Sequence, residues 1–309
     1  MLNLLPILDN VLPVFALMGL GRWLLRRGIL GPEFYATSDR LVYYIFFPAL
    51  LFLKISTASI SWGEAAPLFA AVLSAIFLVW AGSLLYIRWA GLSAFQAGTF
   101  SQVTYRFNTY VGMAVVGSAL GSRGLALFGV LISLAIPFIN LLAVGTLVWF
   151  SEASFSPRQK AALLAKALFQ NPLILGCLAG LLYARLGWPL PKFAANLLGL
   201  MSALTLPLAL LSIGGGLTVA GLQGRLKPAL AAAGFKLVLL PLVGGTLLWL
   251  LGGRGPDFKL ALMFLALPTA TSAYILSRQM GSDAGLAAAS IVASTLLSFF
   301  SLSAVLALV

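Results

Sequence analysis

The chain alternates long uncharged apolar stretches with short segments that hold its charges, glycines and prolines, and this alternation constrains the fold more than any other feature. A helix needs about 20 apolar residues to cross a bilayer. We predict ten crossings, spans 1 to 10, at Leu4 to Leu25, Leu41 to Ile55, Pro67 to Ile87, Ala94 to Leu120, Gly124 to Phe150, Ala162 to Tyr183, Phe193 to Leu217, Pro228 to Leu251, Leu260 to Met280 and Ala284 to Leu308. Membrane barrels need short alternating strands instead. The predicted class is therefore an all-α integral membrane protein.

The composition excludes most functions of soluble proteins. Of the 309 residues, 61% are hydrophobic and 8% are charged, whereas a globular domain has roughly 25% charged residues. The chain has no histidine and a single cysteine, which excludes Ser-His catalysis, histidine or multi-cysteine metal sites and intrachain disulfides. We therefore expect neither an enzyme nor a bound cofactor or metal.

The basic residues outnumber the acidic residues by 19 to 7, and their placement explains this excess. Twelve lie at one set of span ends and six at the other, while Arg106 belongs to neither. Because the cytoplasmic side of membrane proteins normally holds the excess, we expect a cell-membrane protein with both termini outside and with residues 151–160 as a cytoplasmic connector. The charge then indicates a lipid bilayer and no nucleic acid.

The two halves of the chain repeat one another. A shift of 159 residues aligns three prolines and two glycines without a gap, as Pro13 with Pro172, Gly21 with Gly180, Gly28 with Gly187, Pro32 with Pro191 and Pro48 with Pro207. Further on, Gly121-Ser122 aligns with Gly281-Ser282. Each copy, 1–150 and 161–309, holds five spans, and an odd number requires the second copy to enter the membrane from the opposite side. Inverted repeats of this kind are typical of secondary transporters.

Spans 4 and 9 are predicted to be broken helices. Span 4 has polar residues midway, from Gln102 through Arg106, Asn108 and Thr109 to Gly112. At the matching depth, span 9 has Pro268 followed by Thr269, Thr271 and Ser272, and a shift of 160 places Asn108 opposite Pro268. In inverted-repeat transporters, substrate sites lie where paired helices break near the bilayer midplane. A simple kink whose freed carbonyls are satisfied by its own hydroxyls is the alternative.

Arg106 is predicted to lie too deep in span 4 to reach the membrane surface. It needs a polar partner or a wet cavity, since inserting it costs on the order of 2.5 to 3.5 kcal/mol. The candidate structural partners are Asp9 or carbonyl groups freed at the break, and a substrate anion is the functional alternative. Lys236, in span 8, is expected to extend its ammonium group toward the membrane surface, although we retain it beside Asp9 as a possible coupling residue. Asn140, in span 5, is expected to form a hydrogen bond to a neighbouring helix.

Several short motifs together resemble the auxin efflux carrier family, which includes the plant PIN transporters. They are Leu12-Pro13-Val14-Phe15, Phe47-Pro48-Ala49-Leu50-Leu51, Asn108-Thr109, Ile136-Pro137-Phe138-Ile139-Asn140, Asn171-Pro172, Leu206-Pro207-Leu208-Ala209-Leu210 and Pro268. The resemblance covers essentially all ten spans and implies a fold similar to that of the bile-acid sodium symporters. In that fold, spans 4 and 9 cross as broken helices at the substrate site.

The resemblance further implies a scaffold of spans 1, 2, 6 and 7, often dimeric, against which spans 3, 4, 5, 8, 9 and 10 move as a transport domain. The family often has a proline shortly after the span 4 Asn-Thr pair, where this chain has Gly112. The expected substrate-binding residues are Arg106, Asn108, Thr109, Gly112, Pro268, Thr269, Thr271 and Ser272.

The function that we predict is secondary transport of a small organic anion such as a carboxylate, by alternating access of an elevator-like kind. The half-helix N-termini and Arg106 both favour negative charge. The segments around the breaks contain no carboxylate, which favours export driven by the membrane potential. A sodium- or proton-coupled symporter of the bile-acid type, with Gln102 and Asn108 in the ion site, is the alternative. A channel or a sensor is the alternative from another class.

Overall fold

The computed structural model describes residues 5–58, 62–151, 158–159, 162, 165, 170–217 and 224–308, and all regular structure in these residues is helical. Most of the 151–160 connector, together with Lys160 and Lys166, lies outside the described residues. Six helical stretches are long and apolar enough to cross a membrane, namely Pro32–Ser56, Ala66–Trp89, Thr109–Phe150, Lys192–Gly216, Leu226–Leu250 and Ala284–Ala307, and Pro172–Leu186 is a shorter apolar helix. These features are those of an integral membrane protein built from helices.

The first half of the chain begins with α1 (Leu5–Arg26). A single helical rod follows, composed of α2 (Pro32–Leu41), the π-helical turn η1 (Val42–Phe46) and α3 (Phe47–Ser56). This rod begins nine residues before the predicted start of span 2, because Pro32 is well suited to the first helical turn. The rod is followed by α4 (Trp62–Trp89), α5 (Ala94–Val103) and α6 (Thr109–Phe150).

The second half contains α8 (Pro172–Leu186) and α9 (Lys192–Gly216). A second interrupted rod consists of α10 (Leu226–Gly234), the π-helical turn η3 (Phe235–Leu239) and α11 (Leu240–Leu250). The last helices are α12 (Gly255–Leu265), α13 (Ser272–Gln279) and α14 (Ala284–Leu308). Pro48 and Pro241 each lie two residues after the end of a π turn, and a proline ring clashes with the carbonyl four residues earlier, which explains the wider turn at both places.

Glycines in the left-handed conformation end helices at matching places in the two halves. Gly28 and Gly187 have φ values of 67° and 65°, and Gly121 and Gly281 have values of 62° and 67°. Gly91 and Gly252, at 64° and 75°, form a third pair that the sequence alignment did not identify. Only glycine adopts this conformation at little cost, so these positions mark where the chain turns back. Gly121 divides α6 into two helices at such a turn.

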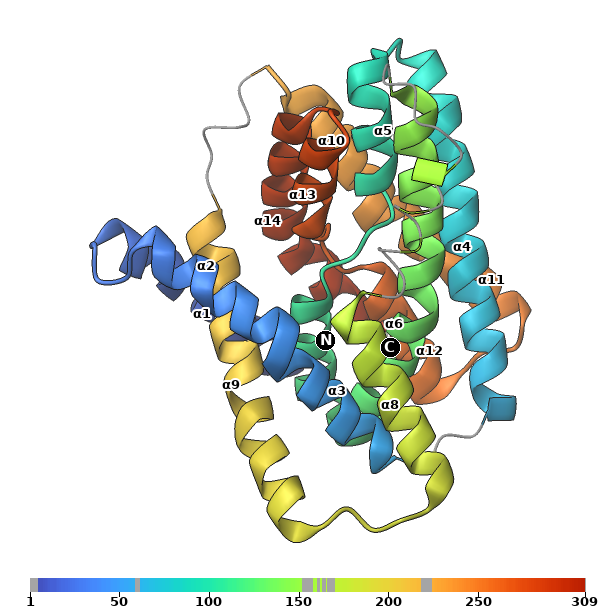
Figure 1. Cartoon of the computed structure of the whole chain (residues 1–309). Coiled ribbons are helices and arrows are strands. Elements are labelled where there is room, and N and C mark those ends of the chain that lie inside the picture. Colours follow the sequence, from blue (N-terminus) through green and yellow to red (C-terminus); the bar gives the residue numbers. More distant parts are fainter. Residues whose placement is uncertain are drawn as a thin grey trace.

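The helices of the two halves also cross in matching pairs. α1 packs against α9, and α3 packs against α8 (Figure 1). In the first crossing, a Cβ atom added to Gly21 would collide with the backbone carbonyl of Leu211. In the second, a Cβ atom added to Gly180 would lie 3.1 Å from the carbonyl oxygen of Phe52. Residues 21 and 180 are separated by 159 positions, as are 52 and 211, so the two crossings are equivalent under the sequence repeat.

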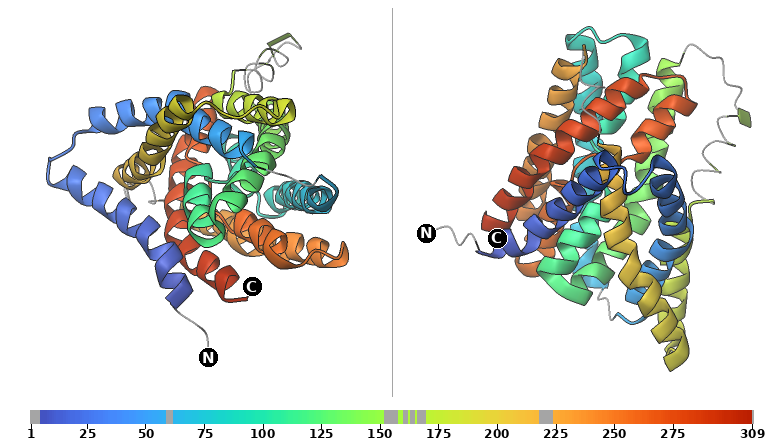
Figure 2. Two further views of the ribbon diagram at one scale, coloured as in Figure 1. Left: turned by 90° about the horizontal axis from the view of Figure 1, so that it is seen from below. Right: turned by 90° about the vertical axis from the view of Figure 1, so that its left-hand side faces the viewer.

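The short helices α5 and α12 lie at opposite ends of the molecule. Figure 1 shows α5 near the top beside α13, and α12 in the lower half beside α6. Figure 2 shows that α9 lies between α1 and α2. The first half of span 4 therefore lies beside the second half of span 9, and the first half of span 9 lies beside α6.

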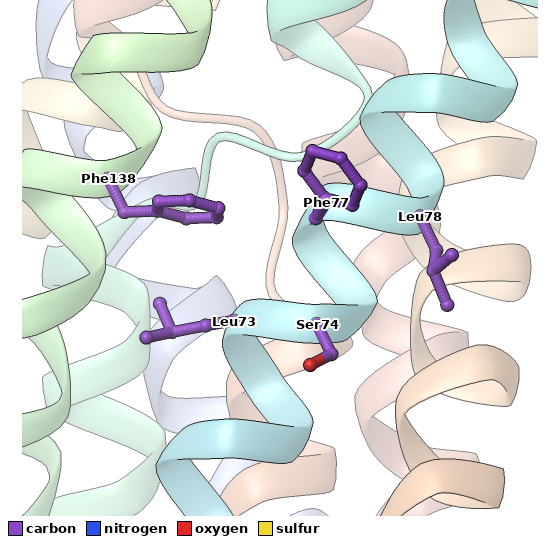
Figure 3. Close-up of a pocket in the computed structure, with 5 residues that line it drawn as sticks. All are labelled: Leu73, Ser74, Phe77, Leu78 and Phe138. Atoms are coloured by element: carbon purple, nitrogen blue, oxygen red, sulfur yellow. The ribbon is translucent and has the colours of Figure 1, made fainter.

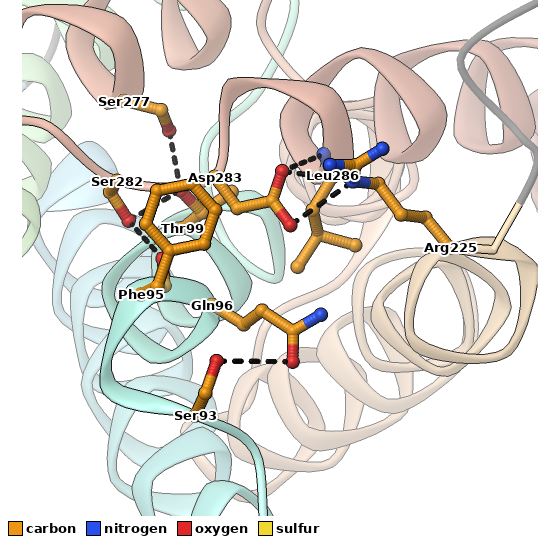
Figure 4. A network of polar contacts seen from close by, with 9 residues as sticks. All are labelled: Ser93, Phe95, Gln96, Thr99, Arg225, Ser277, Ser282, Asp283 and Leu286. Atoms are coloured by element: carbon orange, nitrogen blue, oxygen red, sulfur yellow. Dashed lines mark hydrogen bonds and ion pairs between the residues drawn. The ribbon is translucent and has the colours of Figure 1, made fainter.

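A polar network joins α5, α10, α13 and α14 at the upper end of the molecule (Figure 4). The buried carboxylate of Asp283 accepts hydrogen bonds from Nε of Arg225 at 2.9 and 3.1 Å and from the backbone amide of Leu286 at 2.9 Å. The amide of Asp283 and the hydroxyl of Ser282 both donate to the carbonyl oxygen of Phe95. These contacts hold the turn between α13 and α14 against the start of α5.

The crossing of α1 and α9 provides a test of the close helix contact. Gly21→Ala is expected to lower Tm in detergent, because overpacking costs about 1 to 3 kcal/mol and outweighs the gain of about 0.5 to 1 kcal/mol for alanine in a helix. The matched control is Gly19→Ala on the same helix, where an added Cβ atom has nothing within 4 Å and Tm should be unchanged or higher. Equal Tm values for the two variants would contradict the described crossing.

Candidate functional site

The first helix break lies between α5 and α6. α5 ends at Val103, residues 104–108 leave the helical path, and α6 begins at Thr109. The side chain of Asn108 caps the new helix, since its Oδ1 atom accepts hydrogen bonds from the amides of Tyr110 at 3.1 Å and Val111 at 3.2 Å. Asparagine is among the preferred residues at this position, because it satisfies amides that the first turn leaves free.

The second break lies between α12 and α13. α12 ends at Leu265, and the chain is not helical again until Ser272. Pro268 has no backbone N–H to donate and cannot continue the helix through this segment. Thr271 is at the N-cap position of α13 but makes no capping hydrogen bond with its side chain.

The two breaks are bonded directly to each other. The amide of Asn108 donates a hydrogen bond of 2.8 Å to the carbonyl oxygen of Pro268, the residue aligned with it by the repeat. The hydroxyl of Thr269 donates to the carbonyl oxygen of Val103, the last residue of α5, at 2.9 Å. Backbone groups that are left free in one break thus form hydrogen bonds with groups of the other break. The N-termini of α6 and α13 both lie at this junction.

Arg106 lies inside the first break. Its Nη1 atom donates to Oδ1 of Asn140 and its Nη2 atom donates to Oγ of Ser272, both at 3.1 Å, while its Nε atom is buried without a partner. Among the described residues, the ion pair found is Arg225 with Asp283, and the candidate pairing of Arg106 with Asp9 is not seen. Asp9 is exposed on α1. The guanidinium group therefore has polar neighbours and, in the described part of the chain, no carboxylate that pairs with it.

The predicted site residues occupy two kinds of position. Ser272 is exposed, and Arg106, Thr109 and Thr271 are partly exposed, so a solute could reach their side chains. The other four, Asn108, Gly112, Pro268 and Thr269, are buried. These four residues lie in the interior of the protein, in or next to the two break segments.

Gly112 is positioned by packing. A Cβ atom added to it would lie 2.6 Å from a methyl carbon of Leu267 and would also collide with the ring of Phe128. The small residue at this position thus lets the start of α6 approach the second break closely.

Lys236 does not extend toward the membrane surface, and this expectation was wrong. Its side chain is 0% exposed, and its Nζ atom donates a hydrogen bond of 2.9 Å to the carbonyl oxygen of Leu265, at the end of α12. The π-helical turn η3 carries Lys236, and an inserted residue in a helix redirects the side chains around it. The expectation for Lys236 assumed a regular α-helix, and the sequence did not reveal this π-helical turn.

Two serines of α14 contribute to the second break and were not identified from the sequence. Ser294 accepts a hydrogen bond of 3.0 Å from the amide of Thr269, and Ser301 donates one of 2.9 Å to the carbonyl oxygen of Ala266. Ser294, Ser298 and Ser301 follow helical spacing, which places them on one face of α14. This spacing was the feature of the sequence from which a polar face of α14 could have been predicted.

Gln102, a sodium ligand in the alternative coupling prediction, connects α5 to α13 through its amide nitrogen. Its buried Nε2 atom donates to the hydroxyl of Ser277 at 2.8 Å and to the carbonyl oxygen of Ala273 at 3.3 Å. Its side-chain amide nitrogen is therefore already engaged, while its Oε1 atom has no partner.

A surface crevice of about 410 Å³ lies between α4 and α6 (Figure 3). Its walls are Leu73, Ser74, Phe77, Leu78 and Phe138. With a single hydroxyl and no charged group, this lining suits a hydrocarbon chain better than an organic anion. The polar junction at Arg106 is the better candidate site.

The hydrogen bond from Thr269 to Val103 provides a test of the junction. Thr269→Val keeps the side-chain volume but leaves the buried carbonyl oxygen without its donor, which costs about 1 to 3 kcal/mol. We expect a lower Tm in detergent, with Thr271→Val as the control that removes no capping bond. If both variants unfold at the same temperature as the native protein, the Thr269 bond does not stabilise the junction.

Comparisons with known proteins agree with the membrane fold. The family described as membrane transport protein matches residues 6–306 of this chain. A protein of Methanothermobacter thermautotrophicus, named as an uncharacterized transporter, is 27% identical to it over 95% of each chain. The resemblance inferred from the sequence motifs is confirmed. The chain thus belongs to the membrane transport protein family, the auxin efflux carrier family, and is a multi-pass membrane transporter.

Proposed function

We propose that the protein is a secondary transporter that moves a small organic anion, a carboxylate, across the cell membrane by alternating access. The observation that carries this proposal is the position of Arg106, a positive charge without a carboxylate partner among the described residues, at the junction of two helix breaks.

The charge at the junction supports an anionic substrate. The N-terminus of a helix carries about half a positive elementary charge, and α6 and α13 both begin here. Arg106 adds a full positive charge, and its Nη2 atom is bonded to the exposed hydroxyl of Ser272. A carboxylate could bind to the guanidinium group in a bidentate manner and accept a further hydrogen bond from Ser272 or Thr271. These groups bind an anion without a metal.

The internal symmetry supports alternating access. The three pairs of left-handed glycines and the two equivalent crossings relate the halves by shifts of 159 to 161 residues. The opposite placement of α5 and α12 supports two five-span repeats of inverted orientation. On this proposal, α6 supplies the second half of span 4 and all of span 5, and ten spans result. Exchange between two equivalent arrangements then opens the site to one side of the membrane and afterwards to the other.

The packing also supports a division into a scaffold and a transport domain. α1, α3, α8 and α9 contact one another in the crossings at Gly21 and Gly180, and we assign the scaffold to them with α2 and η1. The remaining helices carry both breaks. Tyr110 at the start of α6 meets Phe47 at the start of α3 with ring centroids 5.1 Å apart, which makes this contact part of the surface that would slide. A homodimer formed by the scaffold, with both termini outside, completes the proposal.

The described break segments favour a carrier driven by the membrane potential. Residues 104–108 and 266–271 contain no aspartate or glutamate, the usual proton carriers and charged sodium ligands. Movement of one negative charge outward through 100 mV releases about 2.3 kcal/mol. Export of the anion is then the downhill direction in a cell with a negative interior.

The role of Arg106 can be tested by ligand-dependent stabilisation. Purified native protein is expected to show a higher Tm with at least one of acetate, malonate, malate and indole-3-acetate, since ligand at 100 times Kd stabilises by about 2.7 kcal/mol. Arg106→Ala should abolish this increase. Arg278→Ala, which removes an exposed arginine at the end of α13, is the control and should preserve it. An increase that persists in Arg106→Ala would assign Arg106 a structural role.

The driving force can be tested in proteoliposomes loaded with the stabilising anion. An imposed potassium diffusion potential, negative inside, should accelerate efflux, whereas a pH gradient alone should not. Efflux that ignores the potential and follows the pH gradient would favour a proton-coupled carrier. Flux that fails to saturate with the anion would favour a channel.

A further inference from the structure

The end of α12 is a negative pole inside the protein. Leu265, its last residue, is fully buried, and the C-terminus of a helix carries about half a negative elementary charge. The carbonyl oxygens at this end have separate partners. The oxygen of Leu262 accepts from the amide of Ala266, that of Leu265 accepts from Lys236, and that of Ala266 accepts from Ser301.

Lys236 is a buried basic residue whose observed partner is this helix end. Its Nζ atom is 2.9 Å from the carbonyl oxygen of Leu265, and the side chain is 0% exposed. Burying an ammonium group is costly unless opposite charge is close. Since the ion pair found in the described part of the chain is Arg225 with Asp283, the negative end of α12 supplies the opposite charge for Lys236.

The two breaks are related by the repeat, but the groups that donate to the carbonyl oxygens at their helix ends differ. At the end of α5, the carbonyl oxygen of Val103 accepts a hydrogen bond from a neutral group, the hydroxyl of Thr269. Shifts of 159 to 161 residues place Phe77, Ile76 or Ala75 at the position equivalent to Lys236, and all three are apolar. In the described part of the chain, a basic side chain bonded to the carbonyl at the helix end is thus found at the second break and not at the first, so the symmetry of the fold does not require it.

We propose that the ammonium group of Lys236 is a tethered cation that takes the place of a free coupling ion at the second break. Sodium would need several oxygen ligands at this helix end, and the carbonyl of Leu265 is already bound to Lys236 while the carbonyl of Ala266 is bound to Ser301. The protein then carries its own cation at this break, and we expect transport to proceed without sodium. This inference rests on the proposed transport function, whose site it adjoins, and specifies how that function is coupled.

The first experiment measures sodium binding and needs no organic anion, so its outcome is independent of the substrate. The Tm of the native protein is compared in sodium chloride and in choline chloride at equal concentration. We expect the same Tm in both salts. A higher Tm in sodium chloride, saturating with sodium concentration, would reveal a free sodium site and overturn the inference.

The second experiment removes the tethered charge. Lys236→Met keeps much of the side-chain volume, and Lys236→Arg keeps the charge, while Lys192→Met changes an exposed lysine at the start of α9 as a control. In proteoliposomes, Lys236→Met is expected to lower the initial rate of anion flux by about tenfold or more, the effect of losing one charged hydrogen bond. Lys236→Arg should retain more of the rate, and Lys192→Met all of it.

Native flux in Lys236→Met would overturn the inference, because the charge would then be dispensable. If Lys236→Met does not fold, the sodium comparison on the native protein decides. If no anion gives measurable flux in the native protein, the proposed function fails, while the sodium comparison still tests the tethered cation.

Discussion

The structure depends on how the backbone is satisfied where two membrane-embedded helices are broken. Lipid offers no hydrogen bonds, so each freed amide and carbonyl needs a partner within the protein. Here each break provides partners for the other. The amide of Asn108 donates to the carbonyl oxygen of Pro268, and the hydroxyl of Thr269 donates to that of Val103. α14 and Lys236 supply further partners. The junction is thereby stable without a continuous helix, and the starts of α6 and α13 remain directed at a common point.

The polar groups at the junction divide into an internal and an accessible set. Asn108 and Thr269, 2% and 1% exposed, hold the chain through hydrogen bonds of the Asn108 Oδ1 atom and the Thr269 hydroxyl. Arg106 and Ser272 are bonded to each other but reach the accessible side. This separation has a physical basis, because a group that both held the backbone and bound a solute would break a buried bond in every transport cycle. The two basic residues differ in the same way, because Arg106 belongs to the accessible set whereas Lys236 is buried at the end of α12.

The sequence predicted much of this arrangement, for reasons that particular residues make clear. Pro268 and the polar residues around Arg106 indicated interruptions, and the structure has helix ends at both places. Asn140, which was expected to form a hydrogen bond to a neighbouring helix, accepts one from Arg106 in the first break. The outward extension of Lys236 was wrong, because it assumed a regular helix, in which depth along the chain determines a side chain's surroundings. The candidate pairing of Arg106 with Asp9 is not among the ion pairs of the described residues.

The sequence by itself determined the membrane class and the family, because apolar stretch lengths and the order of proline and glycine motifs are properties of the linear chain. It also contained the repeat, since duplicated glycines keep their left-handed conformation in both halves. Only the tertiary structure decided which polar residue meets which. Asn108 and Pro268 are 160 positions apart, and Lys236 reaches Leu265 through a π-helical turn. Such contacts depend on packing between distant helices, and local sequence carries little information about that packing.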